Sequence, residues 1–158
     1  MPSTDLISKD AIVPALKAKD KKQALMQLAD VAGKLTGVAP REIFEKLFQR
    51  ERLGSTGVGR GIAIPHLRMS GLDEITCVFA RLDQPIAFDS MDGEPDDLIF
   101  VLLTPEHAGA DHLKALARIS RLMRDVATAQ KLRATRDRAA LHVVLTQSLP
   151  AQAFPLAG

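Results

Sequence analysis

The sequence predicts an α/β fold, in which a mixed parallel and antiparallel sheet is flanked by helices on both sides within a single domain. Segments with helical and with strand periodicity alternate along the chain, which is the pattern of a sheet covered by helices. The turn-rich stretch 85–93 separates two strand signals and lets them pair antiparallel, which makes the sheet mixed. A length of 158 residues suits one domain. We expect the domain to span residues 1–148 and a flexible tail, rich in Ala and Pro, to occupy residues 149–158.

The start of the chain predicts a short strand followed by a helix. Residues 12–16 suit a strand that is interrupted at Pro14. Asp20 is a good N-cap for a helix over 21–35, in which apolar residues recur on one face. Gly37 fits the position just after that helix, where a left-handed backbone is common.

A second helix, a loop and a short strand are expected next. Pro40 suits the first position of the helix, which should end before Gly54. Residues 54–61 are dense in glycine and predict a loop. Residues 62–64 are apolar and predict a short strand that stops at Pro65.

Two strands and three helices are expected in the second half. One strand covers 75–80, and the other covers 98–103, which is apolar throughout and therefore buried. A long amphipathic helix should cover 110–124, with four residues directed inward: Leu113, Leu116, Ala117 and Ser120. Shorter helices should fill 127–134 and 138–148, although the apolar centre of the last segment would also suit a strand.

Composition and motifs exclude several classes of protein. Hydrophobic residues make up 46% of the chain and charged residues 25%, as in a globular domain. The single cysteine, Cys77, lies in an apolar stretch and can form neither an internal disulfide nor a cysteine-based zinc site. The chain has no HExxH motif, no GxSxG motif and no cluster of His and Cys with the spacing of metal ligands. The glycine-rich stretch lacks the Gly-Lys-Ser/Thr sequence that ends a nucleotide-binding P-loop. We therefore expect no metal.

The N-terminus and the hydropathy predict a cytoplasmic protein. The opening Met-Pro-Ser-Thr-Asp is polar and is followed by no apolar core of a signal peptide. The longest apolar run, 98–103, is far shorter than the ~20 residues that span a bilayer. We expect no membrane insertion.

Positive charge is concentrated near the C-terminus. The net charge is only +2, yet residues 118–138 hold seven basic and two acidic side chains. A solvated helix face explains this best, and a docking patch for an acidic protein is the alternative. Nucleic acid is not expected as a partner, because the stretch has no aromatic residue to stack on bases.

Histidines are the candidates for chemistry. His66 follows the strand at 62–64, and a neutral imidazole there is a nucleophile at pH 7. Backbone N–H groups of the glycine loop could hold an anion beside it. His112 lies near the start of the long helix, where negative charge is favoured. Spacing alone leaves structural roles equally open for both. His107 is expected to be solvated, and His142 to be a packing residue.

Arg50 and Arg52 end the second helix. Cations are favourable at the C-terminal end of the helix dipole, which is a sufficient structural reason for both. Either side chain could also lean over a phosphoryl group on His66.

Residues 50–66, RERLGSTGVGRGIAIPH, resemble the phosphorylation-site signature of the fructose/mannitol-type enzyme IIA family of the phosphotransferase system. The sequence is most similar to the nitrogen-regulatory branch of that family. The likeness continues through 82–89, the Asp92-Gly93 turn, 98–105 and 112–117, and covers about residues 6–146.

The resemblance implies a fold, a reaction and a donor. It implies a mixed sheet with helices packed on it, and neither a metal nor a nucleotide cofactor. His66 would receive a phosphoryl group from an HPr-like carrier protein that was itself charged from phosphoenolpyruvate. His112 matches the second active-site histidine of the family, and Arg50 matches an arginine associated with the site. The phosphorylation state would then regulate transport, nitrogen or stress-response partners.

Two positions depart from the family pattern. Leu67 follows the active histidine where a small residue, commonly Gly, is usual, and we expect it to crowd the mouth of the site. Asp96 stands where a small apolar residue is more common.

Three functions from different classes stay open. The first is the phosphorylation-dependent regulator, which the lack of a fused permease or second carrier domain favours. The second is a sugar-specific enzyme IIA that passes the phosphoryl group to a fructose- or mannitol-type permease. The third is a non-catalytic module that binds an anion or a nucleotide. A weak homodimer is also left open.

Overall fold

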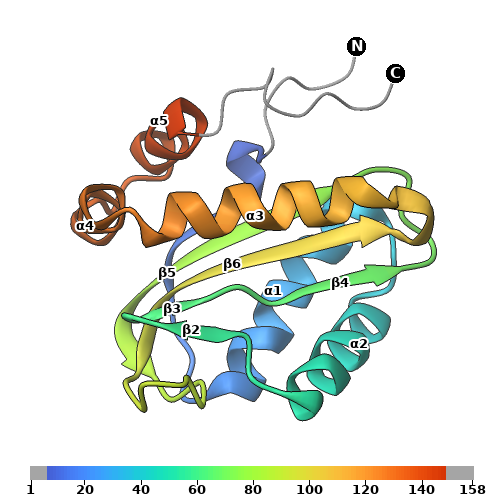
Figure 1. Ribbon diagram of the computed structural model, residues 1–158, viewed down its shortest axis with the longest axis horizontal. Coiled ribbons are helices and arrows are strands. Elements are labelled where there is room, and N and C mark those ends of the chain that lie inside the picture. The colour runs from blue at the N-terminus through green and yellow to red at the C-terminus, as the bar shows by residue number, and fades with distance from the viewer. Residues whose placement is uncertain (1–6, 149–158) are drawn as a thin grey trace.

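The structure, a computed structural model, describes residues 7–148, which form one six-stranded sheet between two layers of helices (Figure 1). The strand order is β1-β5-β6-β3-β2, and β4 also pairs with β6. Strands β5 and β6 are antiparallel, whereas β1 runs parallel to β5, and β3 and β4 run parallel to β6. The predicted mixed sheet is confirmed. The strands are β1 (Ile12–Leu16), β2 (Gly57–Gly59), β3 (Ile62–Ala63), β4 (His66–Met69), β5 (Thr76–Ile86) and β6 (Asp96–Pro105).

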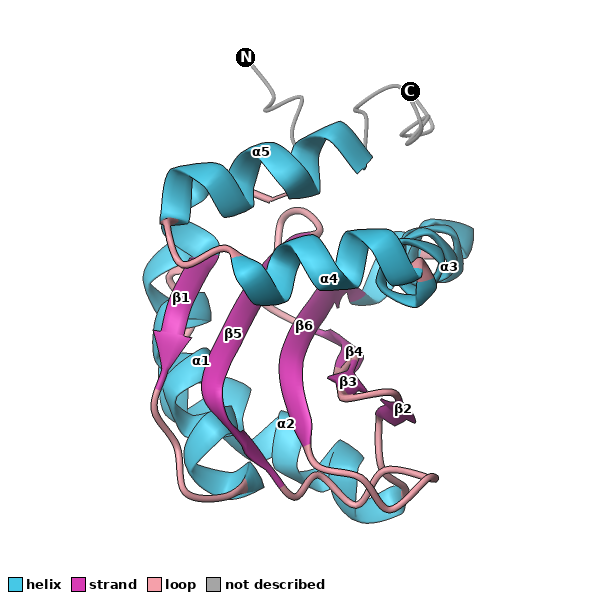
Figure 2. Ribbon diagram, turned by 90° about the vertical axis from the view of Figure 1, so that its left-hand side faces the viewer, coloured by secondary structure: helices cyan, strands magenta, loops and turns pink. Residues whose placement is uncertain are grey.

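The helices cover both faces of the sheet, as predicted. Helices α1 and α2 lie behind the sheet in Figure 1, and α3 crosses in front of it. Helix α5 packs beside α4 and against the edge strand β1 (Figure 2). The helices are α1 (Lys21–Thr36), α2 (Pro40–Leu53), α3 (Ala110–Arg124), α4 (Val126–Ala134) and α5 (Arg138–Ser148), with 3-10 turns η1 (Lys9–Ala11) and η2 (Glu106–Ala108).

Local capping chemistry sets the ends of α1 and α2 where the sequence predicts them. The Asp20 carboxylate accepts a hydrogen bond from the backbone N–H of Gln23 at 2.9 Å. Gly37 closes α1 in the left-handed conformation, with φ 81°. Pro40 is the first residue of α2, where its missing N–H has no cost.

The position of β1 at the edge of the sheet explains its proline. Pro14 has no N–H to give to a neighbouring strand, and within residues 7–148 β1 pairs with β5 alone. The pairing register shifts between Val13 and Leu16. The Pro14 carbonyl accepts a hydrogen bond from Arg81 at 3.3 Å, so a side chain of β5 takes part in holding this strand.

Both central strands are longer than their apolar runs predict. Strand β5 extends to Ile86 and β6 begins at Asp96, and these two residues are partners in the antiparallel ladder. Asp96 is polar but fully buried, because its carboxylate accepts hydrogen bonds from the Ser90 hydroxyl at 2.9 and 3.0 Å. A search for apolar runs misses such a strand end.

The predicted inward face of α3 is only partly right, because Leu116 packs against the core as predicted but two of the other residues do not. Leu113 was expected inside and is 62% exposed, and Ala117 is also exposed. The stripe is rotated because His112 lies on the buried side, where the Thr104 hydroxyl satisfies its ring. The buried residues of α3 are His112, Ala115, Ile119, Leu122 and Met123.

Much of the C-terminal positive charge is structural rather than simply solvated. Arg133 pairs with Asp97 at 2.9 Å, and Arg136 lies 3.5 Å from Asp83. Arg138 donates a hydrogen bond to the Ile12 carbonyl at 3.0 Å. These contacts join the α4–α5 region to the sheet. The docking patch for an acidic protein stays a prediction.

Within residues 7–148, no helix has the length and apolar character needed to cross a bilayer. The expected tail at 149–158 lies outside the described residues.

Candidate functional site

The glycine-dense stretch before His66 is a β-hairpin rather than the predicted loop. Strands β2 and β3 pair antiparallel and are joined by Arg60 and Gly61, whose φ angles of 60° and 79° are both positive. Two positive φ angles are typical of the tight type I′ hairpin turn. Gly57 lies against Ser90, because a β-carbon on Gly57 would be 2.0 Å from the Ser90 hydroxyl oxygen. The hairpin is therefore packed closely onto the segment before β6.

His66 follows the end of a strand, as predicted, and also begins a further one. Strand β3 ends at Ala63, and β4 starts at His66, which is the register partner of Leu102 in β6. The N–H of Ile64 donates to the Thr56 carbonyl, and the N–H of Leu102 donates to the Pro65 carbonyl, both at 2.9 Å. The backbone on the N-terminal side of His66 is thus held on both sides, and the sheet fixes the histidine itself.

One nitrogen of the His66 ring is committed to the backbone. Nδ1 lies 2.7 Å from the carbonyl oxygen of Ile64. Since a carbonyl oxygen can only accept, Nδ1 carries the hydrogen, and the lone pair of the neutral ring is on Nε2. The ring is half-buried. The contact therefore fixes the tautomer of the neutral ring.

His112 lies beside His66, although the two residues are far apart in the sequence and belong to different elements, α3 and β4. The two ring centroids are 6.0 Å apart. His112 lies in the first turn of α3, is 7% exposed, and has its Nδ1 2.7 Å from the Thr104 hydroxyl oxygen. Burial lowers the pKa of His112, and the charges of Arg68 and His66 lower it further. His112 is therefore neutral at pH 7 and can donate a hydrogen bond.

Arg50 makes a contact within its own helix end, and its role at the site stays a prediction. Its Nη1 donates to the Gly54 carbonyl at 2.9 Å, at the end of its own helix, α2. Among residues 7–148, neither His66 nor His112 is a hydrogen-bond partner of Arg50. The helix-end explanation accounts for the observed contact.

Two charged residues near the site were missed at the sequence level. Glu51 is buried and accepts hydrogen bonds from the N–H and hydroxyl of Thr56, at 2.9 and 2.7 Å. It also lies 3.5 Å from the Lys21 ammonium group. Its spacing of four from the buried Leu47 was a signal that Glu51 faces inward.

The second missed residue is Arg68. Its Nη2 donates to the carbonyl of Gly109, the N-cap of α3, at 3.1 Å. Because alternate residues of a strand share a face, Arg68 lies on the same face of β4 as His66. The spacing of two residues from His66 was the available signal that Arg68 shares its face of a strand.

The expectation that Leu67 crowds the mouth of the site is wrong. Leu67 is half-buried and packs against the hydrophobic core. Successive side chains of a strand point to opposite faces, so Leu67 faces away from His112, toward the layer of α2, which contacts β4. The other departure, Asp96, is buried and accepts a hydrogen bond from Ser90, and Gly57 of the hairpin packs against Ser90.

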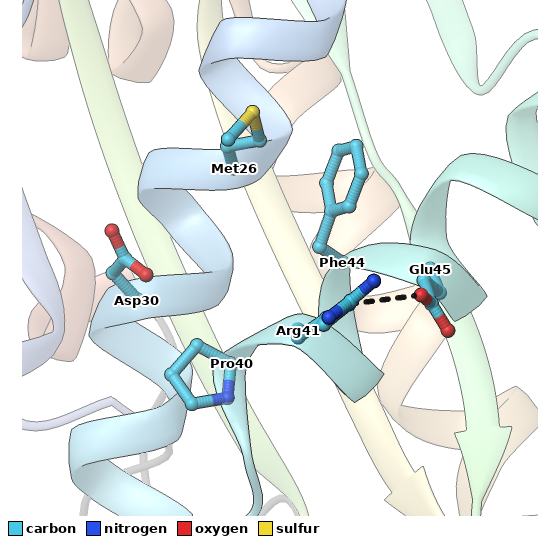
Figure 3. Close-up of a pocket in the computed structure, with 6 residues that line it drawn as sticks. All are labelled: Met26, Asp30, Pro40, Arg41, Phe44 and Glu45. Carbon is cyan, nitrogen blue, oxygen red and sulfur yellow. Dashed lines mark ion pairs between the residues drawn. The ribbon is translucent and has the colours of Figure 1, made fainter.

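A pocket between α1 and α2 lies on the opposite side of the sheet from α3 and His112 (Figure 3). Figure 3 shows the exposed ion pair between Arg41 and Glu45 at its rim. The pocket is lined by Met26, Asp30, Pro40, Arg41, Phe44 and Glu45. It contains neither histidine, and no group of His, Cys, Asp and Glu among the described residues is arranged to hold a metal ion.

Comparison with known proteins gives matches over nearly the whole chain. Residues 5–148 match the family model described as phosphoenolpyruvate-dependent sugar phosphotransferase system, EIIA 2. A nitrogen regulatory protein of Bradyrhizobium diazoefficiens is 60% identical over 145 residues, which are 92% of this chain and 95% of the relative.

One solved structure and one more distant relative extend the comparison. The crystal structure of nitrogen regulatory protein IIA-Ntr from Neisseria meningitidis has a TM-score of 0.85 at 33% identity, covering 89% of this chain and 97% of that one. The fructose-specific EIIABC component of Bacillus subtilis is 32% identical over 146 residues, which are 91% of this chain but 23% of that protein. The matches span both histidines and the sheet between them.

Proposed function

Because the chain belongs to the EIIA 2 family of the phosphoenolpyruvate-dependent sugar phosphotransferase system, we propose that it is a phosphocarrier in which His66 accepts the phosphoryl group on Nε2. The observation that carries this proposal is the 2.7 Å contact between His66 Nδ1 and the Ile64 carbonyl. That contact leaves Nε2 as the nucleophilic nitrogen at neutral pH.

The transfer needs little from the protein beyond position and charge. The Nε2 lone pair attacks phosphorus in line with the nitrogen of a donor phosphohistidine whose ring is protonated on its second nitrogen. The donor N–P bond breaks, and its electron pair returns to the donor ring, which leaves as neutral imidazole. The positive charge passes to the His66 ring, whose Nδ1–H remains bonded to Ile64. No proton has to move during the step.

His112 is the second catalytic residue in this proposal. If the Thr104 hydroxyl donates to Nδ1, the neutral His112 ring carries its hydrogen on Nε2. That N–H is a donor for a phosphoryl oxygen, and the ring lies 6.0 Å from the His66 ring. The first turn of α3 adds the favourable N-terminal end of its dipole.

The proposed donor and targets rest on the similarity to a nitrogen regulatory protein. We propose an HPr-like carrier as donor and regulatory proteins as targets, since the 60% identical relative is a nitrogen regulatory protein. An added charge of roughly −1.5 to −2 at an exposed surface can switch such contacts. A sugar-specific enzyme IIA is the second candidate, supported by the 32% identity to the fructose-specific component.

Intact-mass analysis tests the proposed function. The protein is incubated with phosphoenolpyruvate, enzyme I and a charged HPr-like carrier, beside the variants His66→Ala and His107→Ala. We expect one acid-labile phosphoryl group on the wild type and on His107→Ala, because His107 is an exposed residue of η2. We expect none on His66→Ala. An unmodified wild type, or a modified His66→Ala, would refute the proposal.

A second assay separates the two candidate functions. The phosphorylated protein is mixed with fructose- and mannitol-type permease domains, and loss of its phosphoryl group is followed. A regulator keeps the group, whereas a sugar-specific enzyme IIA transfers it rapidly to a cognate domain.

A further inference from the structure

We propose that Arg68 is a further catalytic residue, whose guanidinium binds the phosphoryl group on His66 during and after transfer. This inference rests on the proposed function of His66. It adds a phosphoryl-binding cation on β4 to the site residues already proposed.

The sheet register places Arg68 in the site. His66 and Arg68 are alternate residues of β4, so both side chains lie on one face of the strand. Arg68 is the register partner of Thr104 in β6. Thr104 in turn holds the ring of His112 through the 2.7 Å contact with Nδ1. Arg68 therefore stands next to the residue that orients the second histidine.

Arg68 also links the two elements that carry the histidines. Its Nη2 donates to the carbonyl of Gly109 at 3.1 Å, and Gly109 is the N-cap of the helix that carries His112. A guanidinium has five N–H donors in a planar fork, and this bond uses one of them. The remaining donors can bind phosphoryl oxygens while the link to α3 is kept.

The charge of Arg68 reaches the site and is not neutralised there. It lowers the pKa of His112, whose ring is 6.0 Å from that of His66. No carboxylate within residues 7–148 forms an ion pair with Arg68, whereas Arg81 and Arg133 are both paired with aspartates. An exposed, uncompensated cation is suited to the charge that accumulates on a transferring phosphoryl group.

Arg50 stays a proposed site residue beside Arg68. Its guanidinium is bound to Gly54 at the end of α2, and neither histidine is among its partners in the described chain. The two arginines can therefore be distinguished by substitution.

The test compares three variants in single-turnover phosphoryl transfer from a charged HPr-like carrier. Arg68→Gln keeps an N–H donor for Gly109 but removes the charge, and Arg68→Lys keeps the charge. Arg41→Gln is the matched control, because Arg41 is an exposed arginine of α2 on the opposite face of the molecule. Thermal unfolding confirms that each variant is folded.

We expect Arg68→Gln to reduce the transfer rate at saturating donor by roughly 100-fold, the lower end of the range for loss of a charge-stabilising donor. Arg68→Lys should recover most of the rate, and Arg41→Gln should equal the wild type. The phosphorylated form of Arg68→Gln should also lose its phosphoryl group faster to water.

Two results would overturn the inference. One is a saturating rate within two-fold of the wild type in Arg68→Gln, including the case in which only the donor concentration needed for half-saturation rises. The other is an equal loss in Arg68→Gln and Arg68→Lys, which would make Arg68 only a link to Gly109. A wild type that is not phosphorylated on His66 would instead refute the proposed function, and the role of Arg68 would fall with it.

Discussion

The two histidines use their ring nitrogens differently. His66 donates from Nδ1 to a backbone carbonyl, which leaves a lone pair on Nε2. His112 faces the Thr104 hydroxyl with Nδ1, and a hydroxyl can donate where a carbonyl cannot. Two neighbouring imidazoles can thus act as nucleophile and as hydrogen-bond donor, because different partners fix their tautomers.

Substitution of Thr104 tests the assigned tautomer of His112. Thr104→Val removes the hydroxyl with little change in shape, so the buried Nδ1 loses its partner. We expect slower phosphoryl transfer and a loss of stability of about 1–3 kcal/mol, the typical cost of an unsatisfied buried polar group. Thr104→Ser keeps the hydroxyl and should transfer at close to the wild-type rate. Equal rates in the Val and Ser variants would contradict the role of Thr104.

The buried Asp96 gives the protein a defined pH dependence of stability. Burial raises the pKa of Asp96 from 3.8 to about 6, although the hydrogen bond from Ser90 acts in the opposite direction and lowers it. The folded state therefore binds the proton more tightly than the unfolded state. The contribution of Asp96 to stability is complete below pH 3.8 and is lost as the pH rises toward 6. A shift of this size corresponds to about 3 kcal/mol between the two limits.

The variant Asp96→Asn removes this titration. We expect the free energy of unfolding of the wild type, relative to that of Asp96→Asn, to fall by up to about 3 kcal/mol between pH 4 and pH 7. Urea unfolding of both proteins at the two pH values measures this difference. The difference would be the same at both pH values if Asp96 titrated normally.

The β2–β3 hairpin has no free space for a methyl group at Gly57. A β-carbon at Gly57 would lie 2.0 Å from the Ser90 hydroxyl oxygen and 3.0 Å from the Ser90 Cα, so Ser90 or the hairpin must move. Ser90 is also the partner of Asp96.

We therefore expect Gly57→Ala to cost about 1–3 kcal/mol, as overpacking does elsewhere. Gly54→Ala is the matched control, because a β-carbon at Gly54 meets nothing within 4 Å. The φ angle of 163° at Gly54 is that of extended backbone, which alanine can adopt. Chemical denaturation of the two variants makes the comparison. Equal stabilities would mean that the hairpin is not packed against Ser90.

Elements whose ends depend on local chemistry were predictable from the sequence. Asp20, Gly37 and Pro40 mark helix boundaries because caps and fixed φ angles act within a few residues. The ends of β5 and β6 were not predictable, because a buried aspartate gains its partner, Ser90, only in the folded chain. The inward face of α3 was only partly right for the same reason, since His112 is buried by virtue of a hydroxyl on another strand.

Across the whole molecule, the sheet separates two different surfaces. The face covered by α3 carries both histidines and Arg68, and the face covered by α1 and α2 carries the pocket in Figure 3. The sequence predicted the two histidines as candidates, and the fold brings them together across β4 and β6. The sequence could not show that Arg50 donates a hydrogen bond to Gly54 and Arg68 one to Gly109. Those contacts depend on distances in the folded chain.

The most direct test of the central claim is to identify the phosphorylated nitrogen by long-range 1H–15N correlation NMR of the histidine rings. The protein, labelled with 15N and charged through the carrier proteins, should show phosphate on Nε2 of His66 and a hydrogen on Nδ1. His112 should remain unmodified. Phosphate on Nδ1 of His66, or on His112, would contradict the assignment of His66 Nε2 as the nucleophile.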